Sequence, residues 1–157
     1  MNLIHRLGLL AATGVVALSA STAVVTASPS VDVRRQLTID AALVSFDFVD
    51  LGEPGVTAGD YFVQADSFTV DGRPGGTDLI HCVAAGHESD PGLCDTVLVL
   101  GDASLTAAGR IPNFEPADGQ PFRFAITGGT GRYRRAQGEI IVTETATGYT
   151  ATVELQT

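Results

Sequence analysis

Apolar and polar residues alternate with a period of two along most of the chain after residue 36, the pattern of strands with one buried face. The turn signals between these runs are clusters such as Asp50–Gly55 and Asp71–Gly76. The expected strands are Leu37–Ala41, Leu43–Val49, Asp60–Val70, Leu79–Ala85, Thr96–Leu100, Ala103–Ala108, Pro121–Thr127, Gln137–Thr145 and Tyr149–Leu155. None of these segments has a convincing helical period.

Short antiparallel strands at regular spacing, almost all in hairpin order, predict an all-β sandwich or an up-and-down barrel. We expect one domain over 36–157, preceded by a short polar lead-in at 28–35. A closed barrel of about eight strands leaves an interior filled by side chains or able to hold one small ligand.

One stretch predicts a sharp corner between two strands. Phe122, Phe124 and Ile126 alternate with polar or small residues, and Gly128–Gly131 then supplies three glycines in four positions. Glycine reaches positive φ at little cost, so the chain can turn sharply there. Tyr133 is placed to pin the corner before the next strand begins at about Gln137.

The first 27 residues predict an export signal. A short basic start, an apolar run over 7–20 and small residues at Val25–Ala27 fit a cleavable leader. The apolar run is short for a bilayer span, although a retained membrane anchor is the alternative. We therefore expect a secreted, extracellular protein.

Cys82 and Cys94 are the only cysteines, and an exported chain meets an oxidising environment. We expect them to form a disulfide that ties down the segment between them. A metal site using His81 and His87 is the alternative. It is disfavoured because adjacent His81 and Cys82 point to opposite faces of a strand, so no metal is expected.

The chain carries a formal net charge of −9 and contains no lysine. This acidity argues against nucleic acid as a partner. The glycine corner also lacks the Gly-Lys-Ser/Thr sequence of a phosphate-binding loop, and no cofactor is expected. No nucleophile-elbow motif supports a hydrolase.

The corner and its flanking strands resemble a stretch found in plant dirigent proteins and in allene oxide cyclases. The matching positions are Gly128, Gly129, Thr130, Gly131, Tyr133, Ala136 and Gly138. This resemblance implies an eight-stranded antiparallel up-and-down β-barrel and association as a homotrimer. On the strand pattern alone, a lipocalin-like or streptavidin-like barrel is the nearest competitor.

Asp47 is the candidate catalytic residue, and Asp66 is a second acid on the early strands. A carboxyl group inside an apolar barrel has a raised pKa and can act as a general acid or base. Allene oxide cyclases place a glutamate on the first barrel strand, and the resemblance makes Asp47 its closest counterpart. The alternative is that both acids face solvent.

Six phenylalanines are candidate walls for a small hydrophobic ligand. Arg123 is a candidate for contacting an anionic or carbonyl group, and the run Arg132–Arg135 is the same type of candidate or a solvated rim. The candidate wall residues are Phe46, Phe48, Phe62, Phe68, Phe122 and Phe124.

Two hypotheses follow. The first is a secreted barrel with a cyclase- or isomerase-like or stereodirecting activity, which holds a hydrophobic substrate in one conformer. The second is a non-catalytic module for small-molecule binding or cell-surface interaction.

Overall fold

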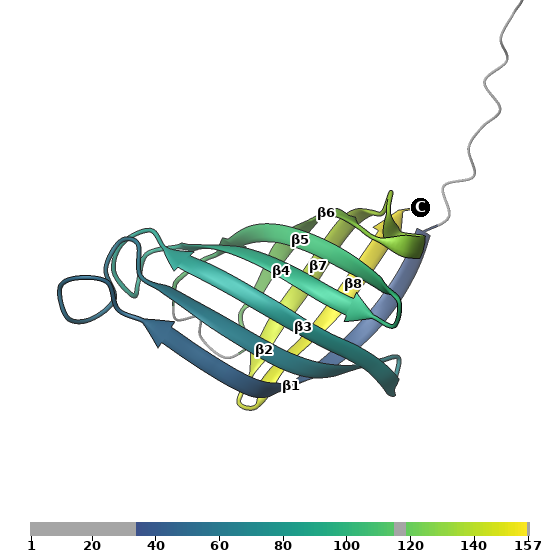
Figure 1. Cartoon of the computed structure of the whole chain (residues 1–157), viewed down its shortest axis with the longest axis horizontal. Coiled ribbons are helices and arrows are strands. Elements are labelled where there is room, and N and C mark those ends of the chain that lie inside the picture. The colour runs from purple at the N-terminus through teal and green to yellow at the C-terminus, as the bar shows by residue number, and fades with distance from the viewer. Residues whose placement is uncertain (1–33, 115–118, 157) are drawn as a thin grey trace, which may run out of the picture. The chain divides into compact units, whose positions relative to one another are not determined.

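The computed structural model describes residues 34–114 and 119–156, which form a closed antiparallel barrel in the strand order β1 to β8 (Figure 1). This confirms the predicted eight-stranded up-and-down barrel. Its strands are β1 Arg34–Val49, β2 Tyr61–Val70, β3 Arg73–Ala84, β4 Gly92–Leu100, β5 Ala103–Ile111, β6 Pro121–Gly129, β7 Gln137–Thr145 and β8 Gly148–Gln156. The expected export signal lies outside the described residues, and β1 begins within the expected lead-in.

β1 is one long strand where the sequence predicted two. It pairs with β8 from Arg34 to Ala42 and with β2 from Ile39 to Val49, so it closes the barrel. A bulge between Leu43 and Ser45 shifts its register against β2. Because a bulge adds one residue, it reverses which side of the strand even-numbered and odd-numbered residues face.

β3 begins at Arg73, inside the segment that the sequence predicted as a turn. Gly76 explains the difference, because its backbone lies against the carbonyl oxygen of Val99 on β4. A Cβ at Gly76 would lie 1.8 Å from that oxygen, so only glycine allows the two strands to approach here. The glycine therefore belongs to the strand pairing and not to the hairpin turn.

Inward-facing side chains fill the half of the barrel where β8 ends. Phe68, Leu105, Tyr133, Val153 and Leu155 are all buried there. The space for a ligand therefore has to lie toward the other half, where β1 and β3 end and β8 begins (Figure 1).

The glycine corner consists of the end of β6, the short 3₁₀ helix η1 (Gly131–Tyr133) and the start of β7. Gly131 has φ +55° and Gly138 has φ +133°, conformations that favour glycine. The Thr130 hydroxyl accepts a hydrogen bond from the Ser104 amide at 2.9 Å, and the Tyr133 ring is buried beneath the corner.

No described segment is a helix long and apolar enough to pass through a bilayer.

Candidate functional site

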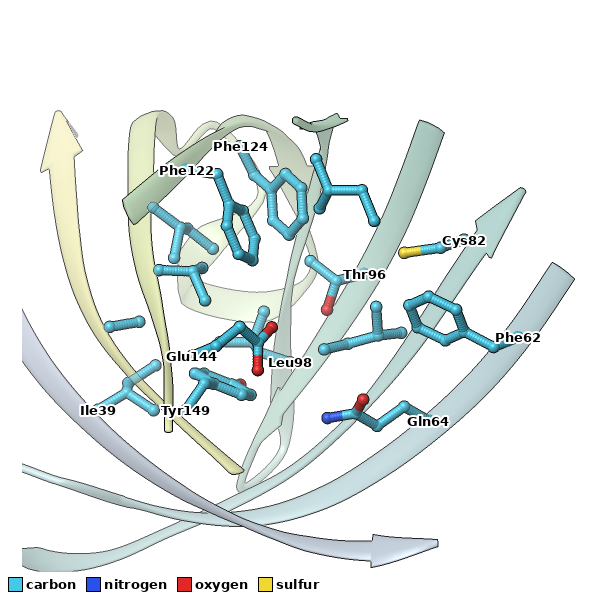
Figure 2. Close-up of a pocket in the computed structure, with 15 residues that line it drawn as sticks. Ile39, Phe62, Gln64, Cys82, Thr96, Leu98, Phe122, Phe124, Glu144 and Tyr149 are labelled. Carbon is cyan, nitrogen blue, oxygen red and sulfur yellow. The ribbon is translucent and has the colours of Figure 1, made fainter. Parts of the chain in front are cut away.

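A pocket lies inside the barrel toward the end where β1 finishes (Figure 2). The space between its lining atoms is about 520 Å³ including its open side, but a water molecule's centre can occupy only about 30 Å³. The pocket is therefore narrow, and a larger ligand requires side chains to move. Its apolar lining is Ile39, Phe62, Ile80, Leu98, Ile111, Phe122, Phe124, Ile140, Val142 and Ala151.

Four polar side chains interrupt this apolar lining. Gln64 comes from β2, Thr96 from β4, Glu144 from β7 and Tyr149 from β8. Figure 2 shows the Glu144 carboxylate and the Thr96 hydroxyl directed into the pocket. Glu144 and Tyr149 are direct partners in the β7–β8 register, so the turn between these strands places both groups together.

Tyr149 connects the pocket to a buried pair of carboxyl groups. Its hydroxyl donates a hydrogen bond to Asp78 Oδ2, and Asp78 Oδ1 accepts one from the Asp66 amide at 3.2 Å. Gln64 Nε2 donates to both carboxylate oxygens of Asp66, at 3.2 and 2.9 Å. Asp66 is 1% exposed and Asp78 is 4% exposed. A chain of polar groups thus runs behind the pocket from Gln64 to Tyr149.

The pKa of Asp78 is raised from 3.8 to about 7, chiefly by burial and also by the nearby Asp66 carboxylate, while the Tyr149 hydrogen bond opposes the shift. Burial and the negative charge of Asp78 also raise the pKa of Tyr149 above its usual value of 10.0. Tyr149 is therefore a protonated hydrogen-bond donor at neutral pH. Asp78 is the group that changes charge near neutrality.

Thr96 presents a hydroxyl without a hydrogen-bond partner among the described residues. Its side chain is 5% exposed, and its Oγ1 atom is buried within the pocket lining. Buried hydroxyl groups in folded proteins usually have partners, because leaving one unpaired costs about 1 to 3 kcal/mol. This hydroxyl is therefore available to a polar atom of a bound molecule.

Cys82 and Cys94 form the expected disulfide, which the structure confirms. The two residues are direct partners in the β3–β4 register, and Cys82 lines the pocket. The bond therefore fixes one wall of the pocket as well as joining the strands.

The predicted aromatic residues divide between the pocket, its mouth and the filled half. Phe62, Phe122 and Phe124 line the pocket. Phe46 lies 5.2 Å from Phe62, measured between ring centroids, and Phe48 lies 6.2 Å from Phe114. Phe46 is 50% exposed and Phe48 is 40% exposed, so both lie at the mouth. Phe68 is buried in the filled half and does not line the pocket.

Asp47 lies outside the pocket. Phe46 and Phe48 pair with Gln64 and Phe62, whose side chains reach the interior, so alternation turns Asp47 to the outer face beside Val63. Its side chain is exposed. Arg123 is also on the outer face, where it forms an ion pair with Glu139. Neither Asp47 nor Arg123 therefore lines the pocket in which a ligand was expected to bind.

The loop between β1 and β2 is held at the mouth by Asp60. Its carboxylate accepts hydrogen bonds at 2.7 Å from both the Leu51 amide and the Thr57 amide. These bonds lower the pKa of Asp60, since they favour its charged form. The ionised Asp60 side chain therefore anchors this loop at two points.

The sequence did not point to Asp78, Thr96, Glu144 or Tyr149 as functional residues, although Asp66 was a candidate as a second acid. Asp78 lay between the expected turn at Asp71–Gly76 and the strand expected to begin at Leu79, so it belonged to no predicted strand. The detectable signal was alternation, since Asp78 lies two residues before Ile80 and four before Cys82 on the same face.

Within the described ranges, no group of three or more His, Cys, Asp and Glu side chains could hold a metal ion.

The chain is similar to several solved structures. A pyocyanin demethylase is 30% identical, with a TM-score of 0.65, over 77% of this chain and 99% of that protein. An exo-specific intermolecular Diels-Alderase is 15% identical with a TM-score of 0.63, over 80% of this chain and 99% of that one. A pterocarpan synthase dirigent protein is 16% identical with a TM-score of 0.57, over 83% and 94% of the two chains.

These three proteins share the same type of barrel, and the first is also 30% identical to this chain over nearly its whole length. No protein-family model and no curated protein matches the chain. The fold and the family therefore rest on the structural neighbours and on the barrel itself.

Proposed function

The chain belongs to the allene oxide cyclase- and dirigent-like barrel family, and from this we propose that it is a secreted protein that rearranges a small hydrophobic molecule inside its barrel. The proposed activity is of the isomerase or cyclase type. The observation that carries it is the placement of Glu144 and Tyr149 side by side in a narrow, mainly apolar pocket. A simple carrier for apolar molecules would not need two proton-transferring groups there.

The chemistry proposed for this pair is proton transfer. The Glu144 carboxylate takes a proton from a carbon atom of the bound molecule. The Tyr149 phenol has a single proton, which Asp78 accepts in the absence of a ligand, so the phenol donates to an oxygen or nitrogen atom of the bound molecule once a protonated Asp78 donates to the phenol oxygen in turn. Asp78 is a positioning residue, because it accepts the Tyr149 hydrogen bond from behind the pocket. Phe62, Phe122 and Phe124 hold the molecule in one conformer while the proton moves.

Secretion is part of the same proposal. The leader-like sequence over 1–27 supports it, as does the Cys82–Cys94 disulfide, because such bonds persist in oxidising compartments. Detection of the processed chain in the culture medium by mass spectrometry tests this part. A chain that keeps its first 27 residues and stays with the cell would contradict it.

Deuterium incorporation tests the proposed activity. Pyocyanin is the first compound to incubate with the protein in D₂O, because the 30%-identical relative is named for acting on it. A panel of neutral polycyclic aromatic compounds follows. We expect at least one compound to gain deuterium or change mass with the protein, and to remain unchanged with Glu144→Gln or Tyr149→Phe.

Asp47→Asn is the matched control, since it removes a carboxylate from the outer face of β1. It should leave turnover unchanged. Capture of a compound that never gains deuterium or changes mass would contradict the catalytic proposal and indicate a binding protein. Equal activity of the wild type and Glu144→Gln would contradict the proposed role of Glu144 in proton transfer.

We also propose that the protein forms a homotrimer through the outer face of β3 and β4. Leu79, Val97 and Val99 lie there with large exposed fractions, and Leu79 and Val97 are direct register partners. Contiguous exposed apolar side chains of this kind are typical of protein interfaces. The family resemblance supports three copies.

A further inference from the structure

The interior of the barrel is acidic. Asp66 and Asp78 are buried inside it, and Glu144 lines the pocket. No arginine or histidine is among the residues that line the pocket. Every arginine and histidine whose side chain the structure describes is exposed. The described positive charges therefore lie on the outer surface together with most of the acids, whereas the ionisable groups in and behind the pocket are acidic.

This separation of charge has a consequence for any molecule that binds in the pocket. Moving a ligand carboxylate from water into a narrow apolar space costs free energy when the space holds no cation to pair with it. Nearby carboxylates add electrostatic repulsion. An organic cation meets the opposite situation, because the Glu144 carboxyl group lies at the pocket wall and attracts a cation when it is ionised. The rings of Phe62, Phe122, Phe124 and Tyr149 present faces that attract cations.

The polar groups also define how such a ligand would lie. The Thr96 hydroxyl enters from β4, and the Glu144 carboxylate enters from β7 (Figure 2). Since Thr96 Oγ1 has no partner among the described residues, a ligand with a hydroxyl, carbonyl or ring nitrogen would satisfy it. The narrowness of the space favours a flat molecule that can slide between aromatic rings.

We propose that the pocket selects its substrate by charge and takes planar aromatic cations, with a polar atom directed to Thr96, while it rejects aromatic carboxylates. This inference rests on the proposed function, because it assumes that the pocket is the substrate site. The proposed substrate class is then planar aromatic cations, which is narrower than small hydrophobic molecules in general.

The test uses three fused-ring probes of the same ring size: N-methylquinolinium, 2-methylnaphthalene and 2-naphthoate. Isothermal titration calorimetry measures the dissociation constant of each with the wild-type protein. We expect the cation to bind about tenfold tighter than the neutral probe and the carboxylate about tenfold weaker than it, the scale of one charge or cation–aromatic interaction in a partly enclosed site. A carboxylate that binds as tightly as the cation would overturn the inference.

Two variants, each of which replaces one carboxylate by an amide, show whether the preference for the cation arises inside the pocket. Glu144→Gln should reduce cation binding about tenfold and leave the neutral probe unchanged, whereas Asp47→Asn on the outer face should change neither. Equal effects of the two variants would mean that overall charge, and not the pocket, attracts the cation, which overturns the inference. Circular dichroism checks that each variant is folded.

Phe124→Ala separates this inference from the function on which it rests. Phe124 lines the pocket, so its truncation should weaken both the neutral and the cationic probe. If the neutral probe binds in a Phe124-dependent way and the cation has no advantage, the charge inference fails while the pocket remains the binding site. If none of the three probes binds, the pocket is not a binding site and both proposals fail.

Discussion

The Tyr149 hydroxyl donates a hydrogen bond to Asp78 although the two residues are 71 positions apart in the sequence. The bond joins β8 to β3 through the inside of the barrel, and both side chains are buried. Because Tyr149 also lines the pocket, the bond connects the surface that meets a ligand with carboxyl groups that a ligand does not reach. The protonation state of Asp78 can therefore influence events in the pocket.

Replacement of Tyr149 by phenylalanine should raise the pKa of Asp78 above its value of about 7. The hydrogen bond from Tyr149 favours the charged form of Asp78, so its loss leaves only the Asp66 amide to oppose the effect of burial. Titration of the Asp78 carboxyl carbon by NMR would detect the change. Turnover should fall about a hundredfold or more if the phenol takes part in proton transfer. An unchanged Asp78 titration would mean that the hydrogen bond does not affect this carboxyl group.

Stability should decrease between about pH 4 and pH 7 because of Asp78. Its pKa is 3.8 in an ordinary environment and about 7 in the folded protein, so between these values the folded state keeps a proton that the unfolded state has released. The free energy of unfolding therefore falls as the pH rises through this window, by an amount on the order of a few kcal/mol.

Asp78→Asn removes this titration and is the direct comparison. Urea unfolding at pH 5 and pH 8 should show a smaller loss of stability for Asp78→Asn than for the wild type. Asp47→Asn, which changes an exposed carboxylate, should behave like the wild type. Parallel pH profiles for wild type and Asp78→Asn would contradict the assignment.

Leu79→Lys should dissociate the proposed trimer. A charged side chain at the centre of an apolar contact is costly to bury without a partner, and Leu79 lies beside Val97 on the outer face. Size-exclusion chromatography with light scattering should report a trimer for the wild type and a monomer for the variant. Thr150→Lys, at an exposed position of β8, is the matched control and should stay trimeric. A monomeric wild type would reject this interface.

Gly129→Ala should destabilise the corner between β6 and β7. A Cβ at this position would lie 2.2 Å from the Ser104 carbonyl oxygen and 3.0 Å from Tyr133 Cβ. Relief of this overlap requires backbone movement, and we expect a loss of about 1 to 3 kcal/mol in the free energy of unfolding. Arg135→Ala, at an exposed position of the same corner, should have little effect. Chemical unfolding followed by tyrosine fluorescence measures both.

Much of the fold was predictable because its signals are local. Alternation identified the strands, and the glycines of Gly128–Gly131 marked the corner where the φ of Gly131 is positive. The disulfide was predictable because Cys82 and Cys94 are the only cysteines. Each of these inferences uses residues close together in the sequence or residues of a unique type.

The candidate site was less predictable because it depends on long-range register. The side that Asp47 faces follows from the positions of Phe46 and Phe48 after a bulge that leaves no clear sequence signal. The contact between Asp78 and Tyr149 exists only once β1 has joined β8 and closed the barrel. Alternation could have placed Asp78 on an inner face, but it could not have identified its partner.

The seam between β1 and β8 also constrains how the protein folds. Arg34 lies opposite Gln156, so the first strand cannot complete its pairing until the final strand has been synthesised. Contacts between distant parts of a chain form slowly, since the loop between them must first be closed. Until then β1 has an unpaired edge. A chain shortened by even one strand would keep that edge open, and we expect it to aggregate.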